Sequence, residues 1–155
     1  MRKLKLTKGL PLALAALSLA GVVVSGYLTW QALITPVGAC PLVLSGFFGC
    51  SAVLSSQYAR IGDMPTALFG LVWFIVAVAL SLGIPRNRRL IVALLAWSVV
   101  GLVGVAGLVY IELFIVGAIC PFCTAAHLLG LAVFGLDVLL WKRKRGQRTS
   151  MSRAS

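Results

Sequence analysis

The chain has 155 residues, of which 61% are hydrophobic and 11% charged, and its formal net charge is +11. A soluble globular domain of this size could not bury so much apolar surface, so the composition predicts an integral membrane protein. All Lys and Arg residues except Arg60 lie at the N-terminus, at residues 86–89 or after residue 141. Basic clusters beside apolar runs are typical of membrane topology signals, so we expect no nucleic acid partner.

Four apolar runs are long enough to cross a membrane, since about 20 helical residues span a hydrocarbon core of about 30 Å. They predict an all-α, polytopic four-transmembrane-helix bundle in one domain over residues 1–141, with helices at about 10–34, 65–84, 90–116 and 119–141. The first run extends beyond the roughly 7–15 apolar residues of a signal peptide, so we interpret it as a membrane helix. Residues 142–155 are predicted to form a basic, disordered cytoplasmic tail that contacts anionic lipid.

The segment between the first two helices, residues 36–64, is predicted to be an outer loop. Its apolar stretches at 41–44 and 47–48 are too short to span, which favours a short surface helix over the bundle. Asp63 is a candidate cap for the second helix, with Pro65 in the first turn. In the third helix Gly101, Gly104 and Gly107 recur every third residue, a pattern that predicts close approach of another helix.

Four crossings place both termini and the 86–89 turn on one side of the membrane. That side carries almost all of the positive charge, so we expect it to be cytoplasmic. The loop with Cys40 and Cys50 then shares the outer side with Cys120 and Cys123, at the start of the fourth helix. Disulfides persist outside the cytoplasm, so the topology makes disulfide chemistry available to all four cysteines.

Cys120-Pro121-Phe122-Cys123 opens the fourth helix. Proline is favoured in a first helical turn, because its missing N–H would have no partner there. Cys120 is therefore a candidate cap, with Cys123 about one turn further in. The positive end of the helix dipole favours thiolate over thiol, and the thiolate is the reactive species.

Two cysteine pairs are compatible with redox exchange or with metal binding. A Cys40–Cys50 disulfide would remove about 2.8 kcal/mol of unfolded-chain entropy in the loop-closure model, and it would suit either a structural staple or a mobile redox pair. Together with Cys120 and Cys123 it would provide the minimum equipment for a thiol–disulfide relay. Zinc is the rival, but the separation of the loop cysteines is wide for a zinc motif, so we expect no metal.

Three ionisable residues lie within or beside the apolar runs. His127, the single histidine, lies four residues after Cys123 and hence on the same helix face. It could hydrogen-bond a quinone or carry a proton, or simply bond a backbone carbonyl, and an intramembrane ionisable group favours function. Glu112 fits interface placement and function about equally, and Asp137 is expected to pair with the basic residues 142–145.

The chain resembles the bacterial vitamin K epoxide reductase family of quinone-coupled thiol oxidases. The resemblance rests on three motifs: Cys-Ser-Ala-Val-Leu-Ser-Ser at 50–56, Pro-Thr-Ala-Leu-Phe-Gly at 65–70 and Ala-Ile-Cys-Pro-Phe-Cys at 118–123. The loop pair comes first and the close-spaced pair last. The disulfide bond formation protein B family has the opposite order and fits less well.

The resemblance implies a quinone-dependent protein-dithiol oxidoreductase of the bacterial inner membrane that supports disulfide formation in exported proteins. Cys40 would take a mixed disulfide from a thioredoxin-fold partner similar to disulfide bond formation protein A, and Cys50 would resolve it. Electrons would pass to Cys120, and Cys123 would reduce menaquinone or ubiquinone. The chain shows no fused thioredoxin-like domain, so we expect a separate partner on the outer side.

The resemblance also implies a site at the outer end of the bundle. Ser56 matches the family's loop serine, His127 falls where relatives carry a group facing the quinone, and Thr66 aligns loosely with a polar quinone contact. The quinone pocket is expected to be lined by the fourth helix with Phe69, Phe114 and Phe122. The loop cysteines are slightly further apart than in many relatives. Two other functions stay open: a heavy-metal transporter using cysteine pairs, and a tetraspan structural protein with a stapled loop.

Overall fold

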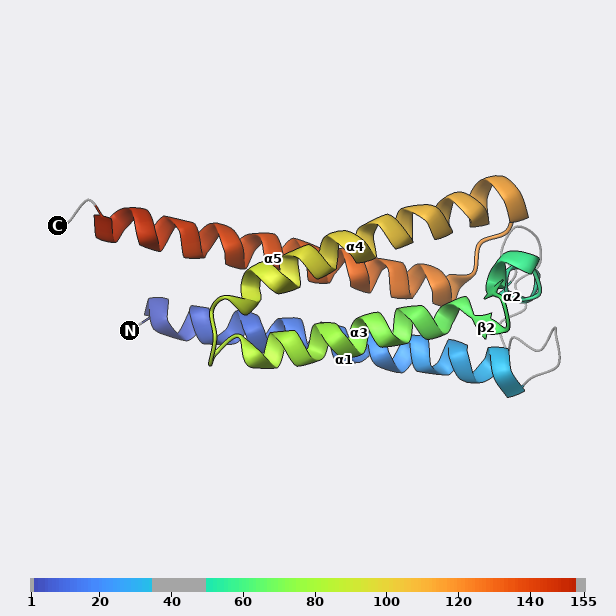
Figure 1. Ribbon diagram of the computed structural model, residues 1–155, viewed down its shortest axis with the longest axis horizontal. Helices are drawn as coiled ribbons and strands as arrows, with labels where there is room; N and C mark the ends of the chain where they lie inside the picture. The colour runs from blue at the N-terminus through green and yellow to red at the C-terminus, as the bar shows by residue number, and fades with distance from the viewer. Residues whose placement is uncertain (1, 35–49, 153–155) are drawn as a thin grey trace.

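The computed structural model describes residues 2–34 and 50–152, and side chains for residues 9–34 and 52–146. In these ranges four long helices lie side by side (Figure 1): α1 (Arg2–Ile34), α3 (Thr66–Gly83), α4 (Leu90–Tyr110) and α5 (Pro121–Ser152). A π-helical turn, η2 (Ile111–Val116), continues α4. Each of the four helices is long and apolar enough to span a membrane, at Gly9–Ile34, Thr66–Gly83, Leu90–Val116 and Pro121–Gly146. The predicted all-α, polytopic bundle is confirmed.

Both termini lie at one end of the bundle, together with the turn between α3 and α4 (Figure 1). At the other end lies a short helix, α2 (Cys50–Leu54), followed by a 3-10 turn, η1 (Gln57–Ala59). An antiparallel hairpin of β1 (Arg60–Ile61) and β2 (Met64–Pro65) leads into α3. Gly62 turns this hairpin with a φ of 64°, a left-handed conformation that glycine adopts without steric cost. The basic clusters therefore lie at one end of the bundle, and α2 and the start of α5, which carry the cysteines, lie at the other end.

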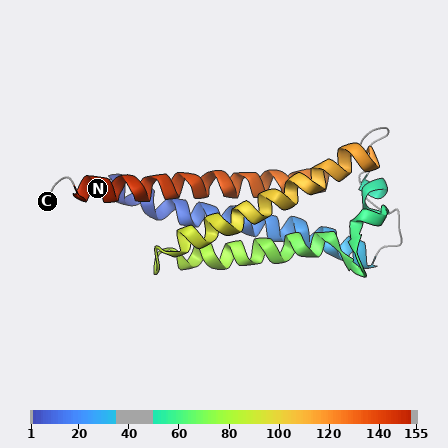
Figure 2. The ribbon, with the colours of Figure 1, turned by 45° about the horizontal axis from the view of Figure 1, so that its top comes forward.

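The half of the bundle near the basic end is held by a buried apolar cluster that joins all four helices. Its buried members are Leu14, Ala77, Ile84, Ile91, Leu94, Val133 and Leu140. Just beyond it, the indole N–H groups of Trp73 and Trp97 each donate to the other residue's backbone carbonyl, at 3.0 and 3.1 Å. These reciprocal bonds fasten α3 to α4. Figure 2 shows α4 slanting away from α3 towards the cysteine end.

A polar contact is buried beside the apolar cluster. Ser98 on α4 donates a hydrogen bond of 2.5 Å to Asp137 on α5, and both side chains are buried. The other carboxyl oxygen of Asp137 has no hydrogen-bond partner. The prediction that Asp137 pairs with the basic residues 142–145 is wrong, because Asp137 faces the interior of the bundle with Val133 and Leu140, one turn away on each side.

Two further predictions from the sequence need correction. The tail expected to be disordered after Trp141 is helical to Ser152, since Lys, Arg and Gln are good helix formers that extend α5 beyond its apolar part. In that extension the Lys144 ammonium donates to the Arg88 carbonyl at 2.8 Å. Asp63 lies in the hairpin turn and does not cap α3, which begins at Thr66 without a side-chain cap. The apolar stretches predicted at 41–44 and 47–48 fall outside the described residues.

Candidate active site

The sulfur of Cys120 caps α5. The backbone N–H of Cys123 donates to the Cys120 Sγ at 3.3 Å, and Pro121 is the first residue of the helix. The Thr124 N–H and hydroxyl both donate to the Cys120 carbonyl, at 2.9 and 3.0 Å. The predicted cap is therefore confirmed. The sulfur sits at the positive end of the helix dipole and accepts an N–H bond, and both interactions are stronger for a thiolate than for a thiol.

Cys120 is fully buried under the short helix α2. Val53 and Leu54 from that helix pack against it, with Phe122 and Cys123 from its own helix. The first residue of α2 is Cys50, one turn before Leu54, so the fold brings the segment that carries Cys50 over Cys120. The side chain of Cys50 and the whole of Cys40 lie outside the described parts of the chain, so the predicted loop pair stays a prediction.

A cavity of about 480 Å³ lies between α3, α4 and α5, below α2. Its walls are largely apolar, and its size is typical of small-molecule sites. The candidate site residues that line it are Ser56, Thr66, Phe69, Glu112, Cys123 and His127. The cavity thus collects five of the ten site residues expected from the sequence, together with Glu112, although they come from four different segments of the chain.

The two cysteines of α5 face different surroundings. Cys120 is enclosed by α2 and is not part of the cavity wall, whereas Cys123 is partly buried and lines the cavity. His127, one turn further along α5, lines the same wall as Cys123. One sulfur is therefore directed to the loop segment and the other to the cavity, an arrangement suited to passing electrons from the first to the second.

The hydroxyl groups expected at the site tie the outer segments together. Ser56 donates to the Val53 carbonyl at 2.8 Å, which closes the turn after α2. Thr66 donates to the Tyr58 carbonyl at 3.1 Å, which joins the start of α3 to η1. Because both hydroxyl oxygens keep acceptor capacity and both residues line the cavity, they remain available to a ligand there.

Glu112 is the site residue whose role the sequence left open. Glu112 is only 7% exposed, lines the cavity together with Cys123, and has its carboxyl group within interaction distance of the Cys123 thiol. It also lies close enough to Cys120 for the two side chains to interact electrostatically. The signal that could have found it is a lone carboxylate in an apolar run, eight residues before Cys120.

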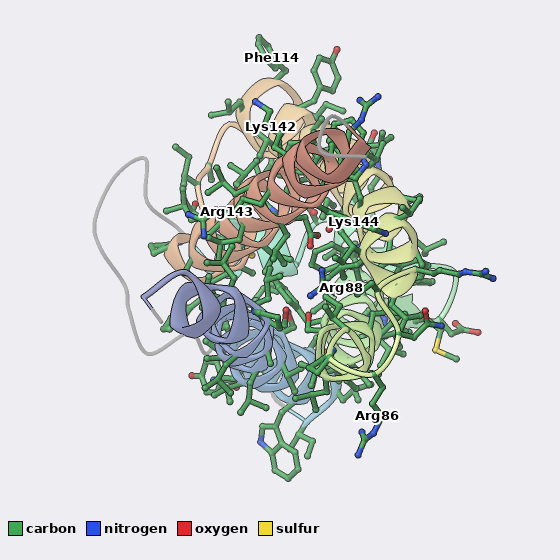
Figure 3. The ribbon with its side chains drawn as sticks, turned by 90° about the vertical axis from the view of Figure 1, so that its left-hand side faces the viewer. Arg86, Arg88, Phe114, Lys142, Arg143 and Lys144 are labelled. Carbon is green, nitrogen blue, oxygen red and sulfur yellow. The ribbon has the colours of Figure 1, made fainter. Side chains whose placement is uncertain are left out.

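Two aromatic residues expected in the pocket lie outside it. Phe114 is 74% exposed, stacks on the Tyr110 ring with centroids 5.0 Å apart, and points away from the bundle in Figure 3. Two helical positions after the inward-facing Glu112, a side chain falls on nearly the opposite face. Phe122 packs beside Cys120, with its ring 5.4 Å from that of Tyr27 on α1. Among the three expected phenylalanines, Phe69 alone lines the cavity.

The glycine stripe of α4 has a different role from the one predicted. A Cβ at Gly101 would overlap the Trp73 indole ring, so close helix approach holds at that position. A Cβ at Gly104 or Gly107 would meet nothing within 4 Å, and both residues line the cavity. The prediction of helix packing is wrong for these two glycines, which instead leave room in the cavity.

Metal ligation can be judged only in part. Over residues 9–34 and 52–146, no three His, Cys, Asp or Glu residues gather in a way that could hold a metal ion. The four-thiolate alternative also needs Cys40, which lies outside the described chain.

A thiol pair that opens a membrane helix, with one sulfur on an apolar cavity inside the bundle, defines the class of integral membrane thiol oxidoreductases. Residues 12–138 match the model of the Vitamin K epoxide reductase family. The match covers most of the chain, so the chain belongs to this family and is a multi-pass membrane oxidoreductase.

Proposed function

We propose that the protein oxidises the dithiol of a thioredoxin-fold partner and reduces a membrane quinone, and so supports disulfide formation in exported proteins. The observation that carries this proposal is the division between the two sulfurs of α5. Cys120 lies under α2, and Cys123 lines an apolar cavity. A relay needs this division, because one sulfur must receive electrons from the loop while the other delivers them to the acceptor.

The cavity fits a quinone, the electron acceptor used by this family. A quinone is a flat ring with two carbonyl oxygens and an apolar tail, so it needs an apolar space with few hydrogen-bonding groups. The 480 Å³ cavity offers such a space, widened by Gly104 and Gly107. We assign His127 as the donor to a quinone carbonyl, with Thr66 as a second polar contact. When bound, the quinone supplies an acceptor for two electrons and two protons. A lipid-soluble ligand would enter from the membrane, and Phe69 on the cavity wall is half exposed on the surface of the bundle.

The proposed order of electron transfer is Cys40, Cys50, Cys120 and then Cys123. In this scheme Cys40 forms the mixed disulfide with the partner and Cys50 resolves it, while Ser56 shapes the loop near the sulfurs. The position of Cys50 at the start of the helix that covers Cys120 supports the middle step. The thiolate-favouring cap at Cys120 supports its role as the sulfur that exchanges with the loop pair.

The proposed orientation places the cysteine end at the outer face of a bacterial inner membrane. Its support is the charge distribution, since the basic termini and the 86–89 turn share the opposite end of the bundle. Positive charge accumulates on the cytoplasmic side of membrane proteins. A partner that carries a thioredoxin fold would then dock on the segment that contains Cys40 and Cys50.

The test is quinone reduction by the purified protein, driven either by a reduced thioredoxin-fold partner or by a small dithiol. Cys123→Ala should abolish turnover with both donors. Cys40→Ala should abolish turnover with the partner and leave part of the turnover with the small dithiol. Ser55→Ala is the control, because the Ser55 hydroxyl is exposed and, within the described chain, donates to the nearby Ala52 carbonyl. Normal turnover in Cys123→Ala would contradict the proposal, and so would stoichiometric metal binding by the reduced protein without any quinone turnover.

A further inference from the structure

The backbone around Glu112 is irregular where the third span approaches the cysteine pair. The last six residues of the third span, Ile111–Val116, form a π-helical turn, a rare conformation that often occurs at functional sites. Gly117 ends this turn with a φ of 68°, and the Ala118 N–H returns to the Glu112 carbonyl at 3.2 Å. The chain thereby doubles back within a few residues, which places the Glu112 side chain against the first turn of α5.

The surroundings of Glu112 contain few groups that could serve as its partners. Cys120 and Cys123, at the start of α5, lie close enough to interact with its carboxyl group, and His127 lines the same cavity. The other segment packed against the π-helical turn is α2, whose sequence Cys-Ser-Ala-Val-Leu holds Cys50 as its single titratable residue. No Lys or Arg residue lines the cavity, so within the described chain no cation faces this carboxyl group there, and Cys120 and Cys123 lie close enough to interact with it electrostatically.

A carboxyl group buried within a membrane span is costly. Acidic residues there are rare and usually mark proton or ion pathways. Glu112 could avoid that cost only by facing the membrane surface, yet it is 7% exposed and turned into the bundle. Its place beside the Cys123 thiol on the same cavity wall therefore points to a role in the chemistry of that sulfur, because a purely structural contact could be made by a neutral side chain.

We propose that Glu112 is a catalytic residue that accepts the proton of the Cys123 thiol when the cysteine pair is oxidised. This inference rests on the proposed function, since quinone is the acceptor of the electrons. In the step, the S–H bonds of Cys120 and Cys123 break and one S–S bond forms between them. Two electrons and two protons leave the pair for the quinone, and the proton from Cys123 leaves through the Glu112 carboxylate, which regains its charge when it gives the proton up.

The first experiment follows the thiol itself, in reduced protein without quinone. The rate at which iodoacetamide alkylates Cys123 is measured by mass spectrometry between about pH 5 and pH 10. A thiol that shares a proton with a carboxyl group titrates in two coupled steps. We expect the profile of the native protein to contain a step that is absent from Glu112→Gln and restored in Glu112→Asp, whereas coupling to the neighbouring Cys120 thiol is common to all three proteins. Asp137→Asn is the matched control, because Asp137 is a second buried carboxyl group that contacts Ser98 and should leave the profile unchanged.

An identical profile in the native protein and in Glu112→Gln would overturn the inference. The second experiment measures quinone reduction, in which loss of a general base lowers the rate by roughly a hundred- to ten-thousand-fold. We expect Glu112→Gln to lower kcat within that range with little change in the KM for quinone. An unchanged kcat would overturn the catalytic role. If the native protein failed to reduce any quinone, the proposed function would fail, whereas the alkylation profiles would still decide whether Glu112 shares the Cys123 proton.

Discussion

The three glycines of α4 give a test in which one substitution has opposite effects at neighbouring positions. At Gly101 an added Cβ would overlap the Trp73 ring, whose N–H is bonded to the Trp97 carbonyl at 3.0 Å. Overpacking costs about 1–3 kcal/mol and a lost hydrogen bond about 0.5–1.5 kcal/mol. The gain in helix propensity from Gly to Ala, about 0.8–1 kcal/mol, offsets only part of this. We therefore expect Gly101→Ala to lower the free energy of unfolding by roughly 1–3 kcal/mol.

At Gly104 and Gly107 the added methyl group would meet no atom within 4 Å. The propensity gain then stands alone, so Gly104→Ala and Gly107→Ala should raise the free energy of unfolding by up to about 1 kcal/mol. Because their methyl groups would occupy part of the cavity, these variants should also raise the KM for quinone. Gly101 lines the cavity too, but its added methyl group would meet the Trp73 ring and not the open space, so Gly101→Ala should leave that KM closer to the native value once the protein is folded.

The assay is reversible unfolding of the purified protein in mixed micelles of mild detergent and sodium dodecyl sulfate, followed by circular dichroism. Quinone kinetics are measured on the same samples. Equal destabilisation at all three positions would refute the reasoning, because it would mean that the whole stripe packs against another helix. Stable Gly104→Ala and Gly107→Ala variants with unchanged quinone kinetics would refute the placement of the quinone in this cavity.

Three other predictions concern single contacts. Cys120→Ala should lose the helix cap and about 1 kcal/mol of unfolding free energy, whereas Cys120→Ser should keep most of that stability, and both should lack turnover. Ser98→Ala should cost about 0.6–1.7 kcal/mol of unfolding free energy, as measured for hydrogen bonds between membrane helices. Ser81→Ala should cost less, because Ser81 donates to the Ala77 carbonyl of its own helix. Both losses are measured in the same unfolding assay, and equal losses would contradict the interhelical role of Ser98. Phe69→Ala should raise the KM for quinone while Phe114→Ala should not, and the reverse result would contradict the cavity walls described above.

Much of the architecture could be predicted from hydrophobicity and charge. The lipid environment requires long apolar helices, so the four spans are visible as four runs, and the basic clusters mark one end of the bundle. The cap at Cys120 was also predictable, because Cys-Pro at the start of an apolar run combines two local preferences. These features depend on short stretches of sequence and on the surrounding solvent.

Features that depend on contacts between helices could not be predicted in the same way. Periodicity gives the face on which a glycine or phenylalanine lies, but not which neighbour occupies that side. Gly101 meets Trp73, while a Cβ at Gly104 would meet nothing within 4 Å and Gly104 lines the cavity. Asp137 turned inward to Ser98, a partner 39 residues earlier in the chain, although basic residues follow it closely in the sequence.

Local irregularity explains the remaining differences. The π-helical turn at Ile111–Val116 has no clear sequence signal, yet it turns Glu112 inward and leaves Phe114 facing away from the bundle. The hairpin before α3 was hidden within a segment predicted to be loop, since strands of two residues carry no periodic pattern. The helical extension to Ser152 was missed because a basic composition suits a solvated helix as well as a disordered tail.

The most direct measurement is a single turnover between reduced protein and one equivalent of quinone, without any external thiol. The variant to use carries Cys40→Ala and Cys50→Ala, so that Cys120 and Cys123 are its only sulfurs able to react. The account predicts one equivalent of quinol and a new Cys120–Cys123 disulfide, identified by mass spectrometry after alkylation. Absence of quinol, or quinol formed while both thiols stay reduced, would contradict the claim that this pair delivers electrons into the cavity.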